Sequence, residues 1–212
     1  MKNPVVIFGA GKLGRLALDI FSSNDVLVYG FLDDDKKKHN TEISEVVVLG
    51  DPMDDGFLKI IGNKTEAFVA LENKTHKEKV VKMLLERRKT MPVNAIHGKA
   101  IVSEDAELGH GILIGPGAVV NQGSKIGNHT VILSNAVVDT QAEIGEFVEI
   151  GNGAIINAEV TIENGAFIGS GAIVVSGIKI GKNARIGAGS VVIEEVKEGA
   201  TVFGNPAVVV GK

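Results

Sequence analysis

Residues 96–197 divide into seventeen consecutive six-residue repeats that share one pattern. The first residue of every repeat is aliphatic, and these residues are Ile96, Val102, Leu108, Ile114, Val120, Ile126, Ile132, Val138, Ile144, Ile150, Ile156, Ile162, Ile168, Val174, Ile180, Ile186 and Val192. The fifth residue is always small or β-branched, from Ala100 in the first repeat to Val196 in the last. A period held without a slip over this length constrains the fold more than any other feature of the chain.

A period of six excludes an α-helix, whose apolar positions recur about every 3.6 residues. It fits short strands with alternate side chains pointing inward, so that each side of a coil supplies one large and one small inward residue. Three such sides make a coil of 18 residues, and Gly and Asn near the corners allow sharp bends. The sequence therefore predicts an all-β parallel β-helix of almost six coils, and not a β-sandwich, which has no such period.

The composition excludes several functional classes. The absence of Cys rules out a disulfide, a thiol nucleophile and a cysteine metal site. A net charge of −4 with 4% aromatic residues argues against nucleic-acid binding. No apolar run approaches the roughly 18 residues of a membrane span, and the apolar residues 4–8 are too short for a signal peptide. We therefore expect a cytoplasmic protein without a membrane span.

The first ninety residues predict an α/β unit with a glycine-rich loop. Residues 4–8 are typical of a buried strand, residues 15–21 of an amphipathic helix and residues 26–32 of a second strand. Between strand and helix lies a G-x-G-x-x-G loop, where a helix N-terminus offers N–H groups to phosphate, and acidic residues about 20 positions on can bind ribose hydroxyls. The candidate nucleotide-binding residues are Gly9, Gly11, Lys12, Leu13, Gly14, Asp33 and Asp34. In the alternative interpretation the glycines only tighten the turn.

The elements that follow predict one nucleotide-binding half-domain. We expect strands near residues 46–49 and 67–71 and helices near 57–61 and 74–89. One half suits a mononucleotide or a nucleotide-sugar better than NAD, which spans two halves. The three lysines at positions 36–38 predict a solvated loop. Because a proline disfavours helix in the residue before it, Pro92 places the boundary between a Rossmann-like domain, 1–91, and the β-helix domain with its closing segment, 92–212.

A half-domain with a glycine-rich loop that leads directly into these repeats resembles the bacterial sugar acetyltransferases of the sialic-acid O-acetyltransferase and bacillosamine N-acetyltransferase type. The matching pieces are residues 9–14, Phe31-Leu32-Asp33-Asp34, Ile126-Gly127-Asn128-His129, Ile144-Gly145-Glu146-Phe147 and Gly204-Asn205-Pro206-Ala207. The resemblance implies a left-handed β-helix and a homotrimer with acetyl-CoA in grooves between neighbouring subunits. It also implies a UDP- or CMP-linked sugar as acceptor, acetylated on an amino or hydroxyl group in surface glycan synthesis.

Acyl transfer favours a base with a pKa near 7, for which His is the natural residue. In the family this base lies in a segment reading Val-Asp-His-Asp or Ile-Glu-His-Glu before Ile-Gly. Here Asp139 is kept, Thr140 stands at the base position and Gln141 at that of its carboxylate partner. Glu149 stands where the family has a second His near the acetyl group. The resemblance places acetyl-CoA contacts at Glu149, Ala158, Ser170 and Ala188.

Three explanations of the missing His stay open. Glu149 or Asp139 replaces the base, or the acceptor is a reactive amine that needs little base help. Otherwise the chain is a catalytically weak or inactive trimeric scaffold that keeps the nucleotide or CoA pocket. A further rival, the partner domain of a nucleotidyltransferase, is disfavoured because the N-terminal half has no long Gly- and Arg-rich loop.

Two histidines in the repeats, His110 and His129, lie one coil plus one residue apart. Two histidines on neighbouring layers of one side could belong to a zinc site like that of the γ-class carbonic anhydrases. Such a site needs a third ligand, and His97 is not one coil from either residue, so no third ligand is found. We expect no metal, and we expect both histidines to be corner residues that face solvent.

Overall fold

The computed structural model describes residues 3–210, and the chain divides into two compact units, Met1–Gly98 and Lys99–Lys212. We call these the N-terminal and the C-terminal unit. Pro92, where the sequence predicts the domain boundary, lies in the N-terminal unit just before β6 (Ala95–Ile96). Within residues 3–210, every helix is too short or too polar to cross a membrane.

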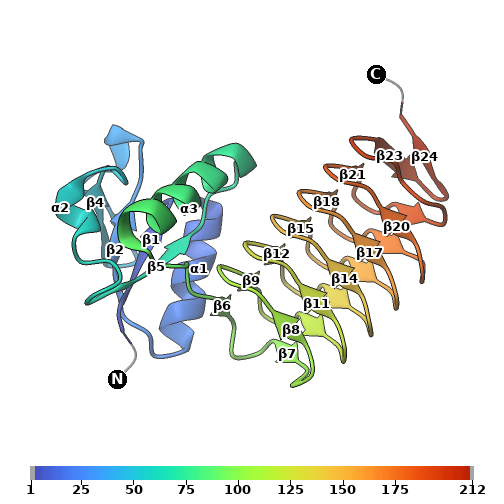
Figure 1. Ribbon diagram of the computed structural model, residues 1–212, viewed down its shortest axis with the longest axis horizontal. Helices are drawn as coiled ribbons and strands as arrows, with labels where there is room; N and C mark the ends of the chain where they lie inside the picture. The colour runs from blue at the N-terminus through green and yellow to red at the C-terminus, as the bar shows by residue number, and fades with distance from the viewer. Residues whose placement is uncertain (1–2, 211–212) are drawn as a thin grey trace. The chain divides into compact units, whose positions relative to one another are not determined.

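The N-terminal unit is an α/β structure built on a five-stranded sheet (Figure 1). Its other elements are β1 (Val5–Phe8), α1 (Lys12–Ser23), β2 (Val28–Leu32), the 3-10 helix η1 (Lys36–Lys38), β3 (Glu42–Ile43), β4 (Val46–Gly50), α2 (Asp55–Leu58), β5 (Glu66–Val69) and α3 (Lys74–Arg88). The strand order is β3-β4-β2-β1-β5, and only β3 and β4 pair antiparallel. The order reverses at β1, because its neighbours β2 and β5 lie on opposite sides, and ligands of such sheets bind at this switch point.

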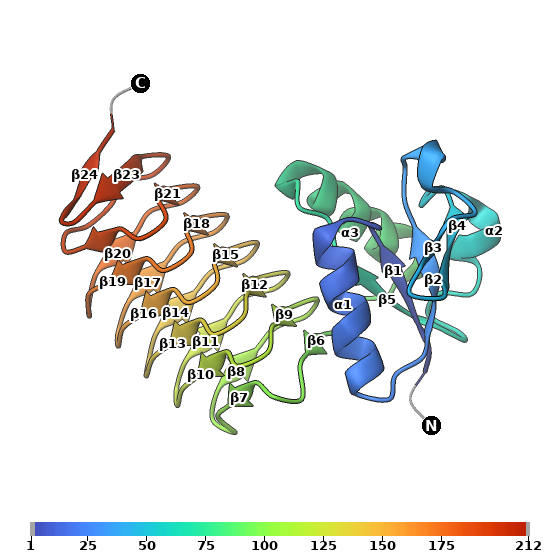
Figure 2. The same ribbon diagram turned by 180° about the vertical axis from the view of Figure 1, so that it is seen from behind.

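Different helices cover the two faces of this sheet, because alternate residues of a strand point to opposite faces. Phe8 of β1 and Leu84 of α3 belong to one buried cluster. Phe68 of β5 instead packs edge-on against Phe21 of α1, with 5.6 Å between the ring centroids. Accordingly, α3 lies toward the viewer in Figure 1 and α1 in Figure 2.

The predicted elements of this unit are confirmed, with local differences. The first helix begins at Lys12, three residues before its predicted start, because Gly11 already serves as its N-cap. Lys36 and Lys37 are exposed, as a solvated loop requires, but the segment is a 3-10 helix and Lys38 forms an ion pair with Asp33 at 3.0 Å. The ion pair joins two residues of the same loop, and a run of three lysines in the sequence does not by itself predict such a pair.

The C-terminal unit is a parallel β-helix of short strands (Figures 1 and 2). Face 1 contains β7 (Ile101–Val102), β10 (Val119–Val120), β13 (Val137–Val138), β16 (Ile155–Ile156), β19 (Ile173–Val174) and β22 (Val191–Val192). Face 2 contains β8 (Glu107–Leu108), β11 (Lys125–Ile126), β14 (Glu143–Ile144), β17 (Thr161–Ile162) and β20 (Lys179–Ile180). Face 3 contains β9 (Leu113–Ile114), β12 (Val131–Ile132), β15 (Glu149–Ile150), β18 (Phe167–Ile168), β21 (Arg185–Ile186), β23 (Thr201–Gly204) and β24 (Ala207–Val209).

The register confirms the predicted coil of 18 residues. Val119 pairs with Val137, and Val137 with Ile155, so each residue stacks on the one 18 positions away. The first-position aliphatic side chains from Ile114 to Val192 are all buried. Buried hydroxyls in the fifth position are also satisfied; for example, the Thr130 Oγ1 donates to the Gly145 carbonyl at 2.8 Å. The core is therefore a column of aliphatic layers without an unpaired hydroxyl at this position.

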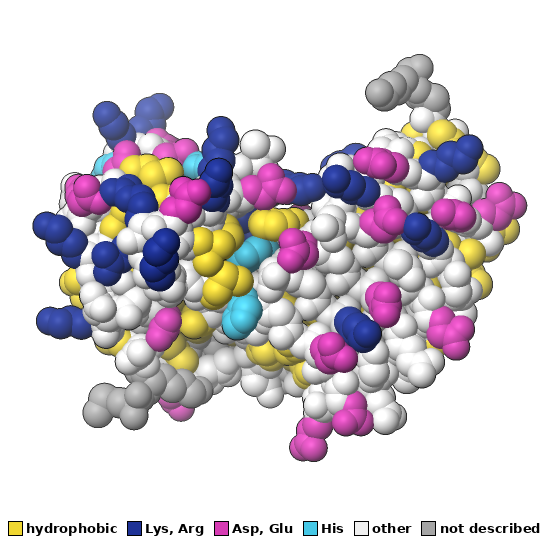
Figure 3. Space-filling view, viewed as in Figure 1, with side chains coloured by type: hydrophobic (Ala, Val, Ile, Leu, Met, Phe, Trp, Pro, Cys, Tyr) yellow, Lys and Arg dark blue, Asp and Glu magenta, His cyan; other side chains and the backbone are white. Residues whose placement is uncertain are grey.

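The outward residues differ from face to face. Those of face 1 are all aliphatic: Ile101, Val119, Val137, Ile155, Ile173 and Val191. Face 2 carries polar and charged residues, and Lys125 contacts Glu143 of the next coil at 3.6 Å. The space-filling view shows acidic and basic side chains interspersed over the β-helix (Figure 3). Face 1 is therefore the apolar side of the prism.

The chain ends in a hairpin that continues face 3. β23 pairs parallel with β21, and β24 pairs antiparallel with β23. Phe203 of β23 packs over Gly187, where a Cβ would lie 2.0 Å from the ring. The hairpin thus extends this edge of the last coil, which would otherwise present unpaired backbone groups.

The end of α3 gives a test of helix termination. Lys89 takes the left-handed conformation with φ 55°, and its N–H donates to the Leu85 carbonyl. Glycine adopts this conformation without a Cβ penalty, so Lys89→Gly is expected to raise the free energy of unfolding by about 1 kcal/mol. The same change at the exposed mid-helix residue, Lys79→Gly, is expected to lower it by about 1 kcal/mol. Urea denaturation of both variants checks this, and shifts of the same sign would contradict it.

Candidate functional site

Packing explains two of the three loop glycines. A Cβ on Gly9, which has φ +107°, would lie 2.7 Å from the Ala70 carbonyl oxygen. A Cβ on Gly14 would lie 2.0 Å from the Gly9 carbonyl oxygen. Gly11 has an ordinary φ of −92° and only the Glu72 carboxylate within 4 Å of that position, at 3.7 Å. The tight-turn interpretation thus accounts for Gly9 and Gly14, whereas Gly11 leaves open space at the N-terminus of α1.

The Asp33 carboxylate fixes the glycine-rich loop by hydrogen bonds. Its Oδ2 accepts a hydrogen bond from the Ala10 N–H at 2.7 Å and from the Lys38 Nζ at 3.0 Å. Its Oδ1 accepts one from the Asp35 N–H at 3.0 Å. Asp33 is also buried, with 5% of its surface exposed. The carboxylate that the sequence predicts to bind ribose hydroxyls is therefore already hydrogen-bonded to donors within the chain. Asp34, the other candidate, is exposed and lies 3.8 Å from the His76 Nδ1.

The environment of Asp33 also sets its ionisation. Burial alone would raise the pKa of this carboxyl. The hydrogen bonds from Ala10, Lys38 and Asp35 outweigh burial, and the pKa is lowered from its ordinary value of 3.8. Asp33 is therefore a carboxylate at neutral pH, and its charge is used to fix the loop.

Two hollows of the N-terminal unit lie at opposite edges of its sheet. The first, at the carboxyl ends of the strands, measures only about 10 Å³ and is lined by Phe8, Gly9, Leu32, Asp33, Asp34, Pro52, Leu71, His76 and Val80. A space of this size admits about one water molecule, so a nucleotide base would have to displace these side chains.

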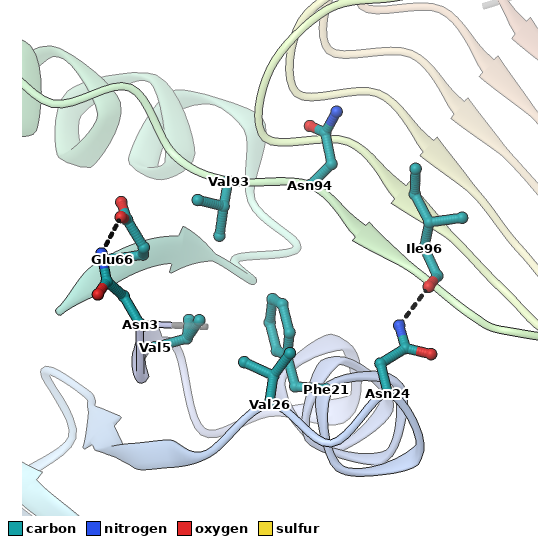
Figure 4. Close-up of a pocket in the computed structure, with 9 residues that line it drawn as sticks. All are labelled: Asn3, Val5, Phe21, Asn24, Val26, Glu66, Val93, Asn94 and Ile96. Carbon is teal, nitrogen blue, oxygen red and sulfur yellow. Dashed lines mark hydrogen bonds between the residues drawn. The ribbon is translucent and has the colours of Figure 1, made fainter. Parts of the chain in front are cut away.

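The second hollow measures about 410 Å³ and lies at the amino ends of β1 and β5 (Figure 4). It is lined by Asn3, Val5, Phe21, Asn24, Val26, Glu66, Val93, Asn94 and Ile96. Asn3 donates to the Glu66 carboxylate and Asn24 to the Ile96 carbonyl oxygen, so both bonds lie on its rim. This hollow is at the edge away from the glycine-rich loop and contains none of the predicted residues.

In the C-terminal unit, Thr140 and Gln141 form the corner between faces 1 and 2 and are exposed. They line a hollow of about 440 Å³ together with Asp105, Gln122 and Gly123. We call it the Gly123 hollow. Sequence reasoning missed Asp105 and Gln122, although Gln122 stands one 18-residue coil before Thr140, so the period would have found it.

Asp139 is tied into the same corner. Its Oδ1 accepts hydrogen bonds from the Asn121 Nδ2 and the Thr140 N–H, both at 2.8 Å. The bond from Asn121 and then that from Thr140 lower the pKa of Asp139. A carboxylate stabilised in this way is a weaker base, which counts against Asp139 as the replacement for His.

The remaining candidates are distributed around the prism. Ala158 stands one coil after Thr140 at the corner between faces 1 and 2, where the Glu159 N–H donates to the Thr140 carbonyl. Ser170 and Ala188 stack at the corner between faces 3 and 1, where the Gly189 N–H donates to the Ser170 carbonyl. Glu149 points outward from face 3.

Thr140 and Glu149 thus lie on opposite sides of the prism. The corner between faces 1 and 2 is the vertex across the core from face 3, because each coil has three sides. The layers of buried aliphatic side chains lie between the two residues. Within one chain the structure therefore brings Thr140, Gln141 and Asp139 together, but not Glu149, Ser170 or Ala188.

The two repeat histidines behave differently. His110 is exposed, as predicted. The prediction for His129 is wrong: it is 4% exposed, and its ring centroid lies 4.8 Å from that of Phe147. The two rings stack because they occupy one corner on successive coils, 18 residues apart. Among residues 3–210, no group of three or more His, Cys, Asp or Glu is placed to hold a metal ion.

Family models match both parts of the chain. The PglD N-terminal domain matches residues 4–84. The bacterial transferase hexapeptide (six repeats) matches residues 123–158 and 159–194. A comparison with curated proteins finds no match.

Solved structures resemble the chain over its whole length. One is a variant of perosamine N-acetyltransferase from Caulobacter crescentus with a histidine replaced by asparagine, in complex with CoA and GDP-perosamine. It has a TM-score of 0.90 and 28% identity and covers 100% of this chain and 99% of that chain. WeeI from Acinetobacter baumannii has a TM-score of 0.86 and 26% identity and covers 98% and 99%.

The acetyltransferase domain of PglB from Neisseria gonorrhoeae, in complex with acetyl coenzyme A, shares the fold. Its TM-score is 0.89 at 23% identity, with 99% of this chain and 100% of that chain covered. These similarities confirm the predicted fold class, an N-terminal α/β domain followed by a left-handed parallel β-helix.

The Asp33 contacts predict an acid-dependent loss of stability. Because the pKa of Asp33 is lowered on folding, its stabilising effect is present above pH 3.8 and is lost as pH falls through the folded-state value. Asp33→Asn removes this charge, and we expect it to lower the free energy of unfolding at pH 7 by about 1–3 kcal/mol. The melting temperature of the variant should then fall less steeply between pH 5 and pH 3. The exposed Asp19→Asn variant should follow the wild type, and equal slopes for all three proteins would refute this role of Asp33.

Proposed function

Because the chain belongs to the hexapeptide-repeat sugar acetyltransferases with a PglD N-terminal domain, we propose that it transfers the acetyl group of acetyl-CoA to an amino group of a nucleotide-linked sugar. The observation that carries this is the full-length similarity to perosamine N-acetyltransferase, which was crystallised with CoA and GDP-perosamine. The nucleotide belongs to the N-terminal unit, near Gly11 and Asp34. The product serves surface glycan synthesis.

An amino acceptor fits the residues at the Thr140 corner. The sugar nitrogen attacks the acetyl carbonyl, the C–N bond forms as the C–S bond breaks, and the proton lost by nitrogen ends on the CoA thiol. A neutral amine is a stronger nucleophile than a hydroxyl and depends less on a base. Thr140 cannot remove a proton at neutral pH and Asp139 is a weakened base, so this chemistry suits an amine better than a hydroxyl.

The assembly that we propose is a homotrimer whose sites lie between copies. Thr140 and Glu149 face away from each other in one chain, so they share a site only if face 3 of a second copy lies beside the corner between faces 1 and 2. The aliphatic outer side of face 1 supports such contact, because an apolar stripe of this length on a polar prism is typical of an interface. Ala158, Ser170 and Ala188 remain proposed acetyl-CoA contacts.

The second candidate is a catalytically weak trimeric binding protein that keeps the nucleotide or CoA pocket. Thr140 and Gln141 at the base position favour it. The two functions differ in turnover and not in ligand binding, so calorimetric titration with acetyl-CoA followed by a transfer assay separates them.

Restoring the expected base gives a direct test of the proposed mechanism. Thr140→His with Gln141→Asp provides an imidazole and a carboxylate at one corner, and a positioned base is worth roughly 10²–10⁴-fold. We expect acetyl transfer to a nucleotide-linked amino sugar to rise at least tenfold, measured as thiol release from acetyl-CoA. Gln141→Asp alone is the control and should leave the rate near that of wild type. A double variant that binds acetyl-CoA but gains no activity would rule out a shared mechanism.

The assembly is tested by charge on face 1. Ile155 is 37% exposed and points outward, and Ile155→Glu would place a carboxylate in the proposed contact, which costs several kcal/mol when unpaired and buried. Sedimentation should show loss of the trimer. Thr161→Glu introduces the same charge on face 2 of the same coil and should leave the trimer intact. A trimeric Ile155→Glu protein would exclude face 1 as the interface.

A further inference from the structure

The Gly123 hollow exists because Gly123 has no side chain between two residues of its column that do. Successive coils place Asp105, Gly123, Gln141, Glu159 and Gly177 at the same position of the corner between faces 1 and 2. Gly123 has φ +69°, and a Cβ there would meet the Gln141 Cγ at 3.4 Å. The gap between the side chains of Asp105 and Gln141 opens a space of about 440 Å³, within the usual range of small-molecule sites.

The lining residues define the ligands that this space can hold. They supply one carboxylate, two side-chain amides and one hydroxyl, and they include neither a cation nor an aromatic ring. A phosphate group finds no positive charge among them, and an apolar ligand finds no apolar wall. Such a lining suits a polyhydroxylated ring that carries hydrogen-bond donors, and above all a donor that is positively charged or can become so.

Asp105 is held in place at the edge of the hollow. Its Oδ2 accepts a hydrogen bond from the Gln122 Nε2 at 3.0 Å, and its backbone N–H donates to the Ser103 Oγ at 3.3 Å. An ionised carboxylate offers about four acceptor positions, so the bond from Gln122 orients the group and leaves capacity for a ligand. Gln122 lies one coil before Thr140, where its carbonyl accepts the Gln141 N–H at 3.0 Å.

We propose that the Gly123 hollow binds the sugar ring of the acceptor and that Asp105 is the specificity-determining residue that accepts a hydrogen bond from its amino group. The inference rests on the proposed function, since it names the residues that would receive that acceptor. The carboxylate attracts the protonated amine from solution. The ammonium gives one proton to solvent, and the neutral amine that remains keeps an N–H bond to Asp105 that turns the nitrogen toward the Thr140 corner. A hydroxyl in place of the amine carries no positive charge, so it would lose the attraction between an ammonium and the Asp105 carboxylate.

The first test is steady-state kinetics of the full chain with acetyl-CoA and nucleotide-linked amino sugars. GDP-perosamine and UDP- and CMP-linked amino sugars are compared, and the acceptor that the wild type uses best becomes the probe. Asp105→Asn should raise the KM for this acceptor at least fivefold and leave the KM for acetyl-CoA within twofold. Glu104→Gln removes the same charge one residue away, outside the lining, and should leave both constants unchanged.

The second test fills the hollow. Gly123→Ala places a methyl group in it, at a positive φ that strains any side chain, and should raise the acceptor KM at least fivefold. Gly199→Ala is the matched control, because Gly199 has φ +66° and no atom within 4 Å of a Cβ there. It imposes similar strain without filling the hollow and should leave the acceptor KM unchanged. If Gly123→Ala fails to fold, the acceptor KM of the Asp105→Asn variant decides whether the proposal stands.

The outcomes separate this inference from the function on which it rests. A wild type that transfers acetyl groups, with an Asp105→Asn acceptor KM raised less than fivefold, overturns the assignment of the hollow and leaves the proposed function standing. An equal rise in both Michaelis constants also overturns it, because a general disturbance moves both. A wild type that binds no acetyl-CoA and acetylates none of the sugars overturns the proposed function, and the inference with it.

Discussion

The stacking of one 18-residue coil on the next is the constraint on which the C-terminal unit depends. Strands in the middle of each face pair in parallel with the strand one coil earlier and the strand one coil later, as Val137 does with Val119 and Ile155. A slip of one residue would turn the inward aliphatic side chains outward. The corners bear the resulting strain, and even Phe147 and Gln141 adopt positive φ angles of 54° and 57° there. Side chains at a corner must therefore stand in columns with an 18-residue spacing.

The neighbours of a corner residue in its column determine how its side chain is hydrogen-bonded and what chemistry it can perform. Asp139 is bonded to Asn121 of the preceding coil and to the next backbone N–H, so its charge stabilises the corner and its pKa is lowered. Asp33 plays a comparable part in the N-terminal unit, where it fixes the glycine-rich loop through Ala10. Both carboxylates resemble functional residues in the sequence, and both are committed to backbone donors. Asp105 differs, because its carboxylate accepts a hydrogen bond from the Gln122 side-chain amide instead of from a backbone N–H, and it borders open space.

A three-sided coil also makes a single chain insufficient for the proposed reaction. Residues on a vertex and on the face across from it point away from each other, as Thr140 and Glu149 do. A site that needs both must take one of them from another copy, which gives the aliphatic outer side of face 1 a role beyond the chain itself. The proposed trimer and the proposed chemistry are thus one hypothesis about geometry.

The sequence by itself determined the coil length, the inward residues and the order of elements around the glycine-rich loop. These are properties of spacing along the chain, and a period of six or a strand–loop–helix pattern is visible without the third dimension. The resemblance to the acetyltransferase family, and not the period, drew attention to the segment with Thr140. Tertiary structure alone decided which partners the side chains have. Asp33 meets Ala10 across 23 residues, His129 is buried against Phe147, and Gly123 leaves a hollow beside Asp105. These outcomes depend on the distances between atoms that folding brings together, and residue type and spacing do not contain them.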